Sequence, residues 1–292
     1  MKVFIAGFRG QLGTELLATA PQGAEVSAMD LPELDITSQA SVESAVRDFC
    51  ADVIINAAAY TAVDKAESEE DLAYSVNCTG VRNLAHAARD CGARFVHIST
   101  DYVFDGTSCR PYLPTDNTSP VSAYGRTKLA GELAVSGELD NYAIIRTSWL
   151  YSAHGANFVK TMLRLMGERK SLGVVADQIG TPTSAKTLAK AVWAAALNES
   201  ACGTYHWSDA GVASWYDFAY NVMLLGVETG LLEREIEIKP IRTADYPTPA
   251  KRPCYSMLDK TDSYRDFAMP AEHWTEPLRE IIYEIKENGN AV

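Results

Sequence analysis

Near its amino end the sequence reads Val3-Phe4-Ile5-Ala6-Gly7-Phe8-Arg9-Gly10-Gln11-Leu12-Gly13, a short apolar run followed by three evenly spaced glycines. A helical pattern through Leu16 and Ala20 comes next. Glycines between a strand and a helix let the backbone approach a pyrophosphate, which binds at the helix N-terminus. Gly7, Gly10 and Gly13 therefore predict a dinucleotide-binding turn.

An acidic residue ends the second predicted strand, Glu25–Met29, about 20 residues beyond the first glycines. A carboxylate at this point accepts hydrogen bonds from the adenosine ribose hydroxyls and repels a 2′-phosphate. Asp30 therefore predicts that NADH is accepted, and its structural alternative is a loop cap. Because Arg9 in the glycine turn could meet a phosphate, NADPH is not excluded.

Apolar strands alternate with helices through the first half of the chain. Further strands are expected at 52–59, 94–99 and 142–147, and helices at 74–91 and 120–136. This alternation predicts an α/β fold, a Rossmann-type doubly wound parallel sheet with right-handed crossovers. Small side chains at the carboxyl end of a parallel strand leave room for a cofactor, and the third strand ends in Ala57, Ala58 and Ala59.

The second half has fewer strands and more loops. Helices are expected at 158–167 and 186–197, and strands at 172–176 and 236–241. We therefore expect a dinucleotide-binding Rossmann domain over 1–150. Residues 151–292 are expected to form a smaller C-terminal α/β substrate lobe, some of whose segments return to the first domain.

Candidate catalytic residues lie in Ser99-Thr100-Asp101-Tyr102-Val103-Phe104 and in Tyr124-Gly125-Arg126-Thr127-Lys128. On the predicted helix, Tyr124 and Lys128 are at i and i+4 and share one face. An adjacent cation favours the phenolate and lowers the pKa of a tyrosine, which suits a general acid or base. The motif alone is weak in a chain with 14 tyrosines, but its position after a strand gives it weight.

The amino-acid composition excludes some classes of partner and indicates where the protein resides. A formal net charge of −12 over 292 residues argues against nucleic acid or an anionic membrane as a partner, because both need a basic surface. The six cysteines form no Cys-x-x-Cys pair, so we expect them to be reduced and structural. Since no apolar run approaches 18 residues and no signal pattern is visible, we expect a cytoplasmic protein.

Longer motifs carry a family resemblance. They are Gly-Gln-Leu-Gly at 10–13, Asn-Ala-Ala-Ala-Tyr-Thr-Ala-Val-Asp-Lys-Ala-Glu at 56–67, Ser-Thr-Asp-Tyr-Val-Phe at 99–104, Arg-Thr-Ser-Trp-Leu-Tyr at 146–151 and Tyr-Pro-Thr-Pro-Ala-Lys-Arg-Pro at 246–253. With them the chain resembles the dTDP-4-dehydrorhamnose reductase family, a branch of the extended short-chain dehydrogenases/reductases, over nearly its whole length.

The resemblance implies NADH- or NADPH-dependent reduction of the C4 ketone of a nucleotide sugar, with no metal in the chemistry. It implies that Tyr124 donates the proton, that Lys128 lowers the tyrosine pKa and holds the nicotinamide ribose, and that Thr100 polarises the ketone. The other cofactor contacts it implies are Gln11, Leu12, Asp30, Asp35, Ile36, Ala57, Ala58 and Ala59. The substrate contacts expected are Thr100, Asp101, Tyr102, Trp149 and Arg252, where Trp149 could instead be core and Arg252 a solvated loop charge.

One departure and two alternatives remain. Some family members are described as metal-bridged dimers built on glutamates. Glu15 fits, but Lys186 stands where another ligand is expected, so we predict no metal, while a homodimer stays open.

A nucleotide-sugar epimerase or dehydratase with retained NAD is one alternative function. The dehydratase is disfavoured because Tyr102 stands where an acidic pair would be expected near Thr100. A non-catalytic NAD(P)-binding regulatory subunit of the methionine adenosyltransferase type is the other, and the intact catalytic residues argue against it.

Overall fold

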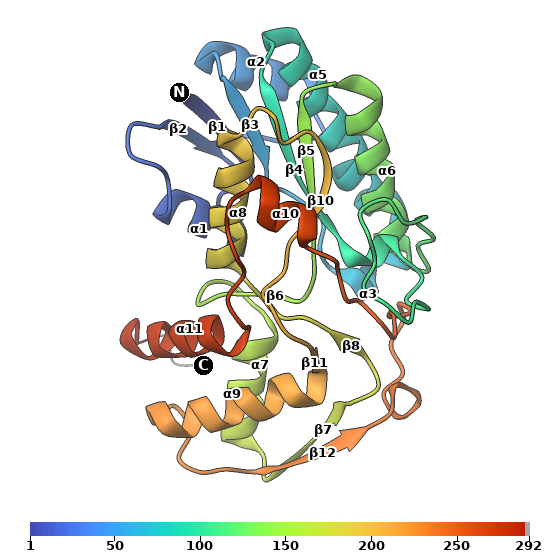
Figure 1. Ribbon diagram of the computed structural model, residues 1–292, viewed down its shortest axis with the longest axis vertical. Helices are drawn as coiled ribbons and strands as arrows, with labels where there is room; N and C mark the ends of the chain where they lie inside the picture. Colours follow the sequence, from blue (N-terminus) through green and yellow to red (C-terminus); the bar gives the residue numbers. More distant parts are fainter. Residues whose placement is uncertain (290–292) are drawn as a thin grey trace.

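A six-stranded sheet forms the centre of the computed structural model, which describes residues 1–289 (Figure 1). Its strands are β1 (Lys2–Ala6), β2 (Glu25–Met29), β3 (Val53–Asn56), β4 (Arg94–Thr100), β5 (Tyr142–Thr147) and β10 (Gly203–His206). The order is β10-β5-β4-β3-β1-β2, and all neighbouring strands are parallel. The predicted doubly wound α/β sheet is confirmed.

Helices cover both faces of this sheet. They are α1 (Gln11–Ala18), α2 (Gln39–Phe49), α5 (Val81–Cys91), α6 (Ala123–Glu138) and α8 (Ala185–Leu197). Side chains alternate along each strand, so Phe4 packs with α2 and α5 on one face, whereas Ile5 packs with α1 and α8 on the other. Burial on both faces explains why these strands read as continuous apolar runs.

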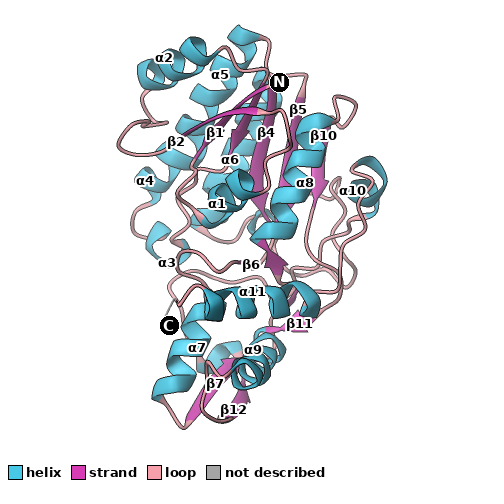
Figure 2. Cartoon of the chain, turned by 90° about the vertical axis from the view of Figure 1, so that its left-hand side faces the viewer, coloured by secondary structure: helices cyan, strands magenta, loops and turns pink. Residues whose placement is uncertain are grey.

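The remaining elements are short or belong to the second lobe. They are α3 (Val63–Ala66), α4 (Glu70–Tyr74), η1 (Ser75–Gly80), η2 (Asp101–Val103), β6 (Leu150–Tyr151), α7 (Phe158–Glu168), β7 (Ser171–Val175), β8 (Ile179–Gly180), β9 (Thr183–Ser184), β11 (Ala213–Ser214), α9 (Trp215–Thr229), β12 (Glu237–Ile241), η3 (Thr243–Asp245), α10 (Thr261–Asp266) and α11 (Thr275–Glu287). Figure 2 shows α7, α9 and α11 gathered below the sheet beside the β7–β12 pair.

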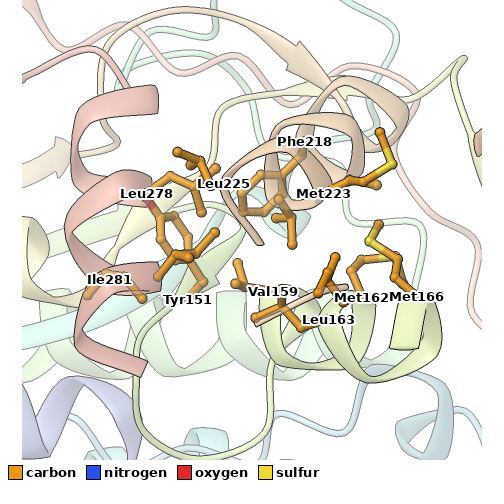
Figure 3. Packing of buried hydrophobic residues seen from close by; sticks show 14 of the residues in the cluster. Tyr151, Val159, Met162, Leu163, Met166, Phe218, Met223, Leu225, Leu278 and Ile281 are labelled. Carbon is orange, nitrogen blue, oxygen red and sulfur yellow. The ribbon is translucent and has the colours of Figure 1, made fainter. Parts of the chain in front are cut away.

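The second lobe has its own apolar core. Phe218 and Met223 of α9, Leu163 of α7 and Leu278 of α11 converge on it, together with Tyr151 (Figure 3). All five side chains are almost completely buried. The helices α7, α9 and α11 and the strands β7 and β12 share this core, and the lobe lies beside the carboxyl ends of the strands of the sheet.

The strand expected at 52–59 is shorter, ending at Asn56, and two expected helices also differ from the sequence prediction. The helix expected over 74–91 is divided into α4, the π-helix η1 and α5, and Asn77 on η1 donates to the Tyr60 carbonyl at 3.1 Å and to Thr127 Oγ1 at 3.1 Å. The helix expected from residue 120 begins at Ala123, because Ser122 Oγ accepts the Gly125 N–H at 3.1 Å and caps it.

Segments beyond residue 150 return to the sheet. Strand β10, which the sequence analysis did not identify, pairs with β5, and α8 packs against α1. We therefore propose that residues 185–207 belong with the dinucleotide-binding domain, as does α10, where Tyr264 packs on Trp207, and that the substrate lobe is built from the rest of 151–289. Within the described chain, every helix is too short or too polar to cross a membrane.

Candidate active site

The glycine turn follows β1, where the sheet order reverses between β1 and β3. Ligands bind at such switch points because the connections leave in opposite directions and open a crevice. Gly7 has φ +88°, and a Cβ there would lie 2.5 Å from the backbone nitrogen of Ala58. A Cβ on Gly13 would lie 2.2 Å from the Gly7 carbonyl oxygen. The turn therefore requires glycine at both positions.

A cavity of about 260 Å³ opens beside this turn. Its lining includes Gly7, Gly10, Asp30, Asp35, Ile36 and Ala57 to Ala59, so the structure brings these predicted cofactor contacts together. Its glycine floor, small alanines and two carboxylates fit the adenosine half of a dinucleotide. The residues present thus suit NADH or NADPH.

Gln11 and Leu12 are among the predicted cofactor contacts that do not line this cavity with their side chains. Gln11 Oε1 accepts hydrogen bonds from Ser152 Oγ at 3.1 Å and Asn157 Nδ2 at 2.9 Å, and Leu12 is buried in the core. Both lie in the first turn of α1, whose N–H groups have no partner within the helix. The backbone N–H groups of both residues are therefore available to a cofactor.

Thr100 and the Tyr124–Lys128 face of α6 meet at the carboxyl end of β4. Thr100 Oγ1 donates to Asp101 Oδ1 at 2.9 Å and accepts the Tyr102 N–H at 3.2 Å. The rings of Tyr102 and Tyr124 pack edge to face, with centroids 5.5 Å apart. The three predicted catalytic residues are all buried.

The electrostatics of Tyr124 differ from the sequence expectation. Burial raises its pKa above the ordinary value, and a hydrogen bond with Thr100 opposes that shift only in part. Lys128 Nζ donates to the Ile98 carbonyl oxygen at 2.7 Å, and burial lowers the lysine pKa to about 8. The expected lowering of the tyrosine pKa by Lys128 is thus absent from this structure, because the ammonium group bonds to the backbone of β4 and the phenol lies in a desolvated environment.

Asp101 is the buried carboxylate of the site. Burial raises its pKa to about 6, although Thr100 Oγ1 donates a hydrogen bond to its Oδ1 atom at 2.9 Å. Its Oδ2 atom is buried and has no hydrogen-bond partner among residues 1–289. A buried acceptor of this kind is available to a bound polar group.

Arg252 joins the first lobe to the loop before α10. Its guanidinium donates to Tyr102 Oη at 3.1 Å and to Asp64 Oδ2 at 2.7 Å. Burial raises the pKa of Tyr102 to about 12, so its hydroxyl is neutral at physiological pH. Asp64 is a contact that the sequence analysis missed; it lies inside one of the family motifs but carries no local pattern.

A larger cavity of about 480 Å³ lies between Arg252 and the second lobe. Phe158, Gln178 and Trp215 line it, and the Trp149 ring stacks on Trp215 with centroids 3.7 Å apart. Trp149 is therefore the second layer of an aromatic wall. The sequence analysis missed Phe158 and Trp215, because aromatic residues on amphipathic helices look like core.

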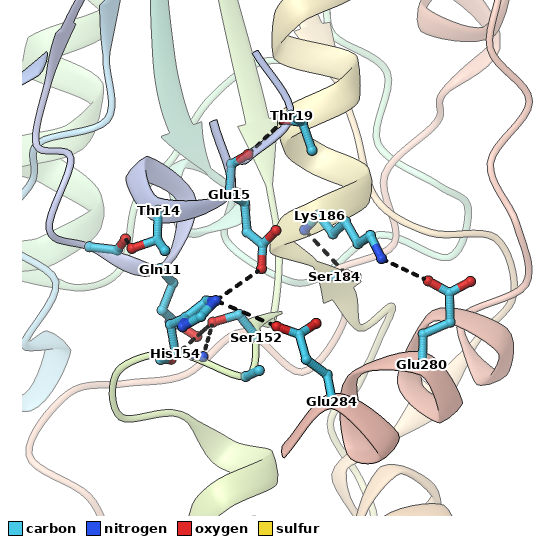
Figure 4. A network of polar contacts seen from close by, with 12 residues as sticks. Gln11, Thr14, Glu15, Thr19, Ser152, His154, Ser184, Lys186, Glu280 and Glu284 are labelled. Atoms are coloured by element: carbon cyan, nitrogen blue, oxygen red, sulfur yellow. Dashed lines mark hydrogen bonds and ion pairs between the residues drawn. The ribbon is translucent and has the colours of Figure 1, made fainter. Parts of the chain in front are cut away.

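A second polar cluster joins α1, α11 and the loop after β6 (Figure 4). The Nε2 atom of His154 is 3.7 Å from a Glu15 oxygen and 3.6 Å from a Glu284 oxygen. These three could supply ligands to a cation, but a protonated His154 would also pair with both carboxylates. Lys186 instead pairs with Glu280 at 3.3 Å. The expectation of no metal stays a prediction.

Comparisons with known proteins agree with this geometry. The model of the family described as RmlD substrate binding domain matches residues 1–287. A dTDP-4-dehydrorhamnose reductase of Sinorhizobium fredii is 42% identical, over 99% of each chain. A crystal structure of a dTDP-4-dehydrorhamnose reductase from Clostridium acetobutylicum has a TM-score of 0.92 and 42% identity, and covers 98% of this chain and 100% of that one. The Bacillus anthracis enzyme of the same name, solved in complex with NADP, has a TM-score of 0.92 and 38% identity, and covers 97% and 99%.

Proposed function

The chain belongs to the RmlD substrate-binding-domain family, and we propose that it reduces the C4 ketone of dTDP-4-dehydro-L-rhamnose to dTDP-L-rhamnose with Tyr124 as the proton donor. The full-length relatives support the reaction, and the family resemblance found in the sequence is confirmed. The cofactor is NADH or NADPH, and the enzyme is an oxidoreductase. The substrate is a nucleotide sugar.

The protein's part in the chemistry follows from three side chains. A bound nicotinamide supplies the hydride. Because burial keeps the phenol of Tyr124 protonated, it is ready to donate a proton to the C4 oxygen as negative charge develops there. Thr100 donates to Asp101 in this structure, so polarising the ketone would require its hydroxyl to turn. Lys128 would hold the nicotinamide ribose from the same helical face.

The nucleotide would occupy the larger cavity. Arg252 borders it and offers a planar guanidinium to a diphosphate. Trp215, backed by Trp149, offers a flat aromatic surface to a base or a sugar. Asp101 and Tyr102, which lie next to Thr100, would face the sugar hydroxyls.

The observation that carries the proposal is the convergence of Thr100, Tyr124 and Lys128 at the edge of the sheet that also carries the cofactor cavity. The test is the decay of NADH absorbance with dTDP-4-dehydro-L-rhamnose, with NADPH assayed in parallel. We expect decay matched by formation of dTDP-L-rhamnose. Cofactor binding without consumption would contradict the reduction and favour an epimerase with retained NAD or a regulatory subunit.

Location and assembly are further parts of the proposal. All six cysteines are free, which suits the reducing cytoplasm. The net charge of −12 disfavours nucleic acid as a partner. A homodimer is also proposed, and light scattering of the purified chain would measure whether the mass in solution is that of a dimer.

A further inference from the structure

Arg9 of the glycine turn is held in place by the loop after β2. Its Nη2 atom lies 3.1 Å from each carboxylate oxygen of Glu33, and its Nη1 atom donates to the Leu31 carbonyl. Its backbone N–H donates to Asp30 Oδ2 at 3.0 Å. The guanidinium is therefore tied to the segment that forms the edge of the adenosine cavity.

The adenosine cavity itself is acidic. The charged residues among those that line it are Asp30 and Asp35. A 2′-phosphate on the adenosine ribose would lie beside Asp30, where the carboxylate repels it. Arg9 is the cation whose backbone N–H bonds to this carboxylate, and its guanidinium has the planar donor geometry that binds a phosphate bidentately.

We propose that Glu33 lowers the affinity for NADPH relative to NADH, because its ion pair with Arg9 withholds the guanidinium from the 2′-phosphate of NADPH. When the pair opens, Arg9 turns to the phosphate and offsets the repulsion from Asp30. The inference rests on nicotinamide cofactor binding at this cavity, as in the proposed function. Both side chains are about half exposed, so opening the pair costs little and lets both cofactors bind.

The test is calorimetric titration with NAD⁺ and NADP⁺, which needs no turnover. Glu33→Gln keeps the shape of the side chain and removes its charge, so we expect the affinity for NADP⁺ to rise by about twofold to fivefold with NAD⁺ unchanged. Arg9→Gln should weaken NADP⁺ by about tenfold, because it removes a charged hydrogen bond, and weaken NAD⁺ by less, because the guanidinium also holds the Leu31 carbonyl at the cavity edge. An unchanged ratio of the two affinities in Glu33→Gln would overturn the inference.

A matched control is available on α7. Arg164 and Glu168 form a pair at 3.0 Å whose side chains are 48% and 55% exposed, against 49% and 56% for Arg9 and Glu33. Glu168→Gln makes the same charge change outside the adenosine cavity and should leave both affinities unchanged. An equal gain for NADP⁺ in this control would show a general effect of net charge and refute the role of Glu33.

The double variant separates release of Arg9 from simple repulsion. If Glu33 acts through Arg9, Glu33→Gln should have no effect on NADP⁺ in the Arg9→Gln background. The same gain in both backgrounds would overturn the inference, because the Glu33 charge would then repel the phosphate directly. Failure of the unsubstituted chain to bind either cofactor would instead refute the proposed function.

Discussion

Lys128 Nζ donates to the Ile98 carbonyl oxygen at 2.7 Å, one helical turn from the phenol of Tyr124. The lysine thereby fastens α6 to the end of β4 and places its ammonium group in a desolvated environment. Burial lowers the pKa of Lys128 to about 8 and raises that of Tyr124. Burial therefore favours the uncharged form of both groups, which lie one turn apart on α6.

Tyr124→Phe removes the proposed proton donor and little else. We expect kcat to fall by about 10²-fold to 10⁴-fold, because general acid catalysis contributes on that scale. NADH affinity should stay within about twofold, since the ring and its packing on Tyr102 are retained. Single-turnover oxidation of NADH, with binding measured separately by fluorescence, checks both. Turnover equal to that of the unsubstituted enzyme would refute the assignment.

Lys128→Met tests the lowered lysine pKa. Between about pH 8 and the ordinary value of 10.5, the folded chain has lost a proton that the unfolded chain keeps, so stability rises with pH in this window. The variant lacks this gain. From pH 8 to pH 10, the free energy of unfolding of the unsubstituted chain should therefore rise relative to that of the variant by on the order of 2 kcal/mol.

Urea titrations at pH 8, 9 and 10 measure this difference. Lys260 also has its pKa lowered to about 8 by burial. Because it is present in both proteins, its contribution cancels. A difference that stays constant with pH would contradict the lowered pKa of Lys128.

The sequence predicted the sheet and the cofactor turn better than the site walls. The glycine turn at Gly7 and the apolar runs of the buried strands are patterns that can be recognised in a short stretch of sequence. Strand β10 was missed because Gly203–His206 is short and lacks an apolar run. Trp215 carries no local sign that it borders a cavity. The pKa of Tyr124 depends on where the Lys128 ammonium points, which spacing along a helix does not determine.

Gly13→Ala and Gly10→Ala separate folding of the turn from binding. A Cβ on Gly13 would collide with the Gly7 carbonyl oxygen at 2.2 Å, whereas one on Gly10 has its nearest contact at 3.6 Å. We expect Gly13→Ala to lower the free energy of unfolding by about 2 kcal/mol or more. Gly10→Ala should cost less than about 1 kcal/mol and still weaken NADH, because Gly10 lines the proposed cofactor cavity, where the added methyl group takes up space. Denaturation and NADH titration of both variants check this; equal stability losses would contradict it.

Glu132→Gln tests the buried ion pair that supports the catalytic helix. Arg146 donates to the two Glu132 oxygens at 2.9 and 2.7 Å, and Ser99 Oγ donates to one of them at 2.5 Å. Glu132 lies one turn beyond Lys128 on α6, so the pair joins this helix to β4 and β5. Removing one charge leaves Arg146 buried without its partner, and we expect a loss of about 3–5 kcal/mol in the free energy of unfolding.

The double variant Glu132→Leu/Arg146→Met is the control. It removes both charges and leaves apolar side chains of similar size, so it should recover much of the stability lost in Glu132→Gln. Urea denaturation gives the stability, and NADH oxidation shows whether Lys128 keeps its place. A double variant less stable than Glu132→Gln would show that the pair contributes directly to stability rather than mainly avoiding an unpaired buried charge.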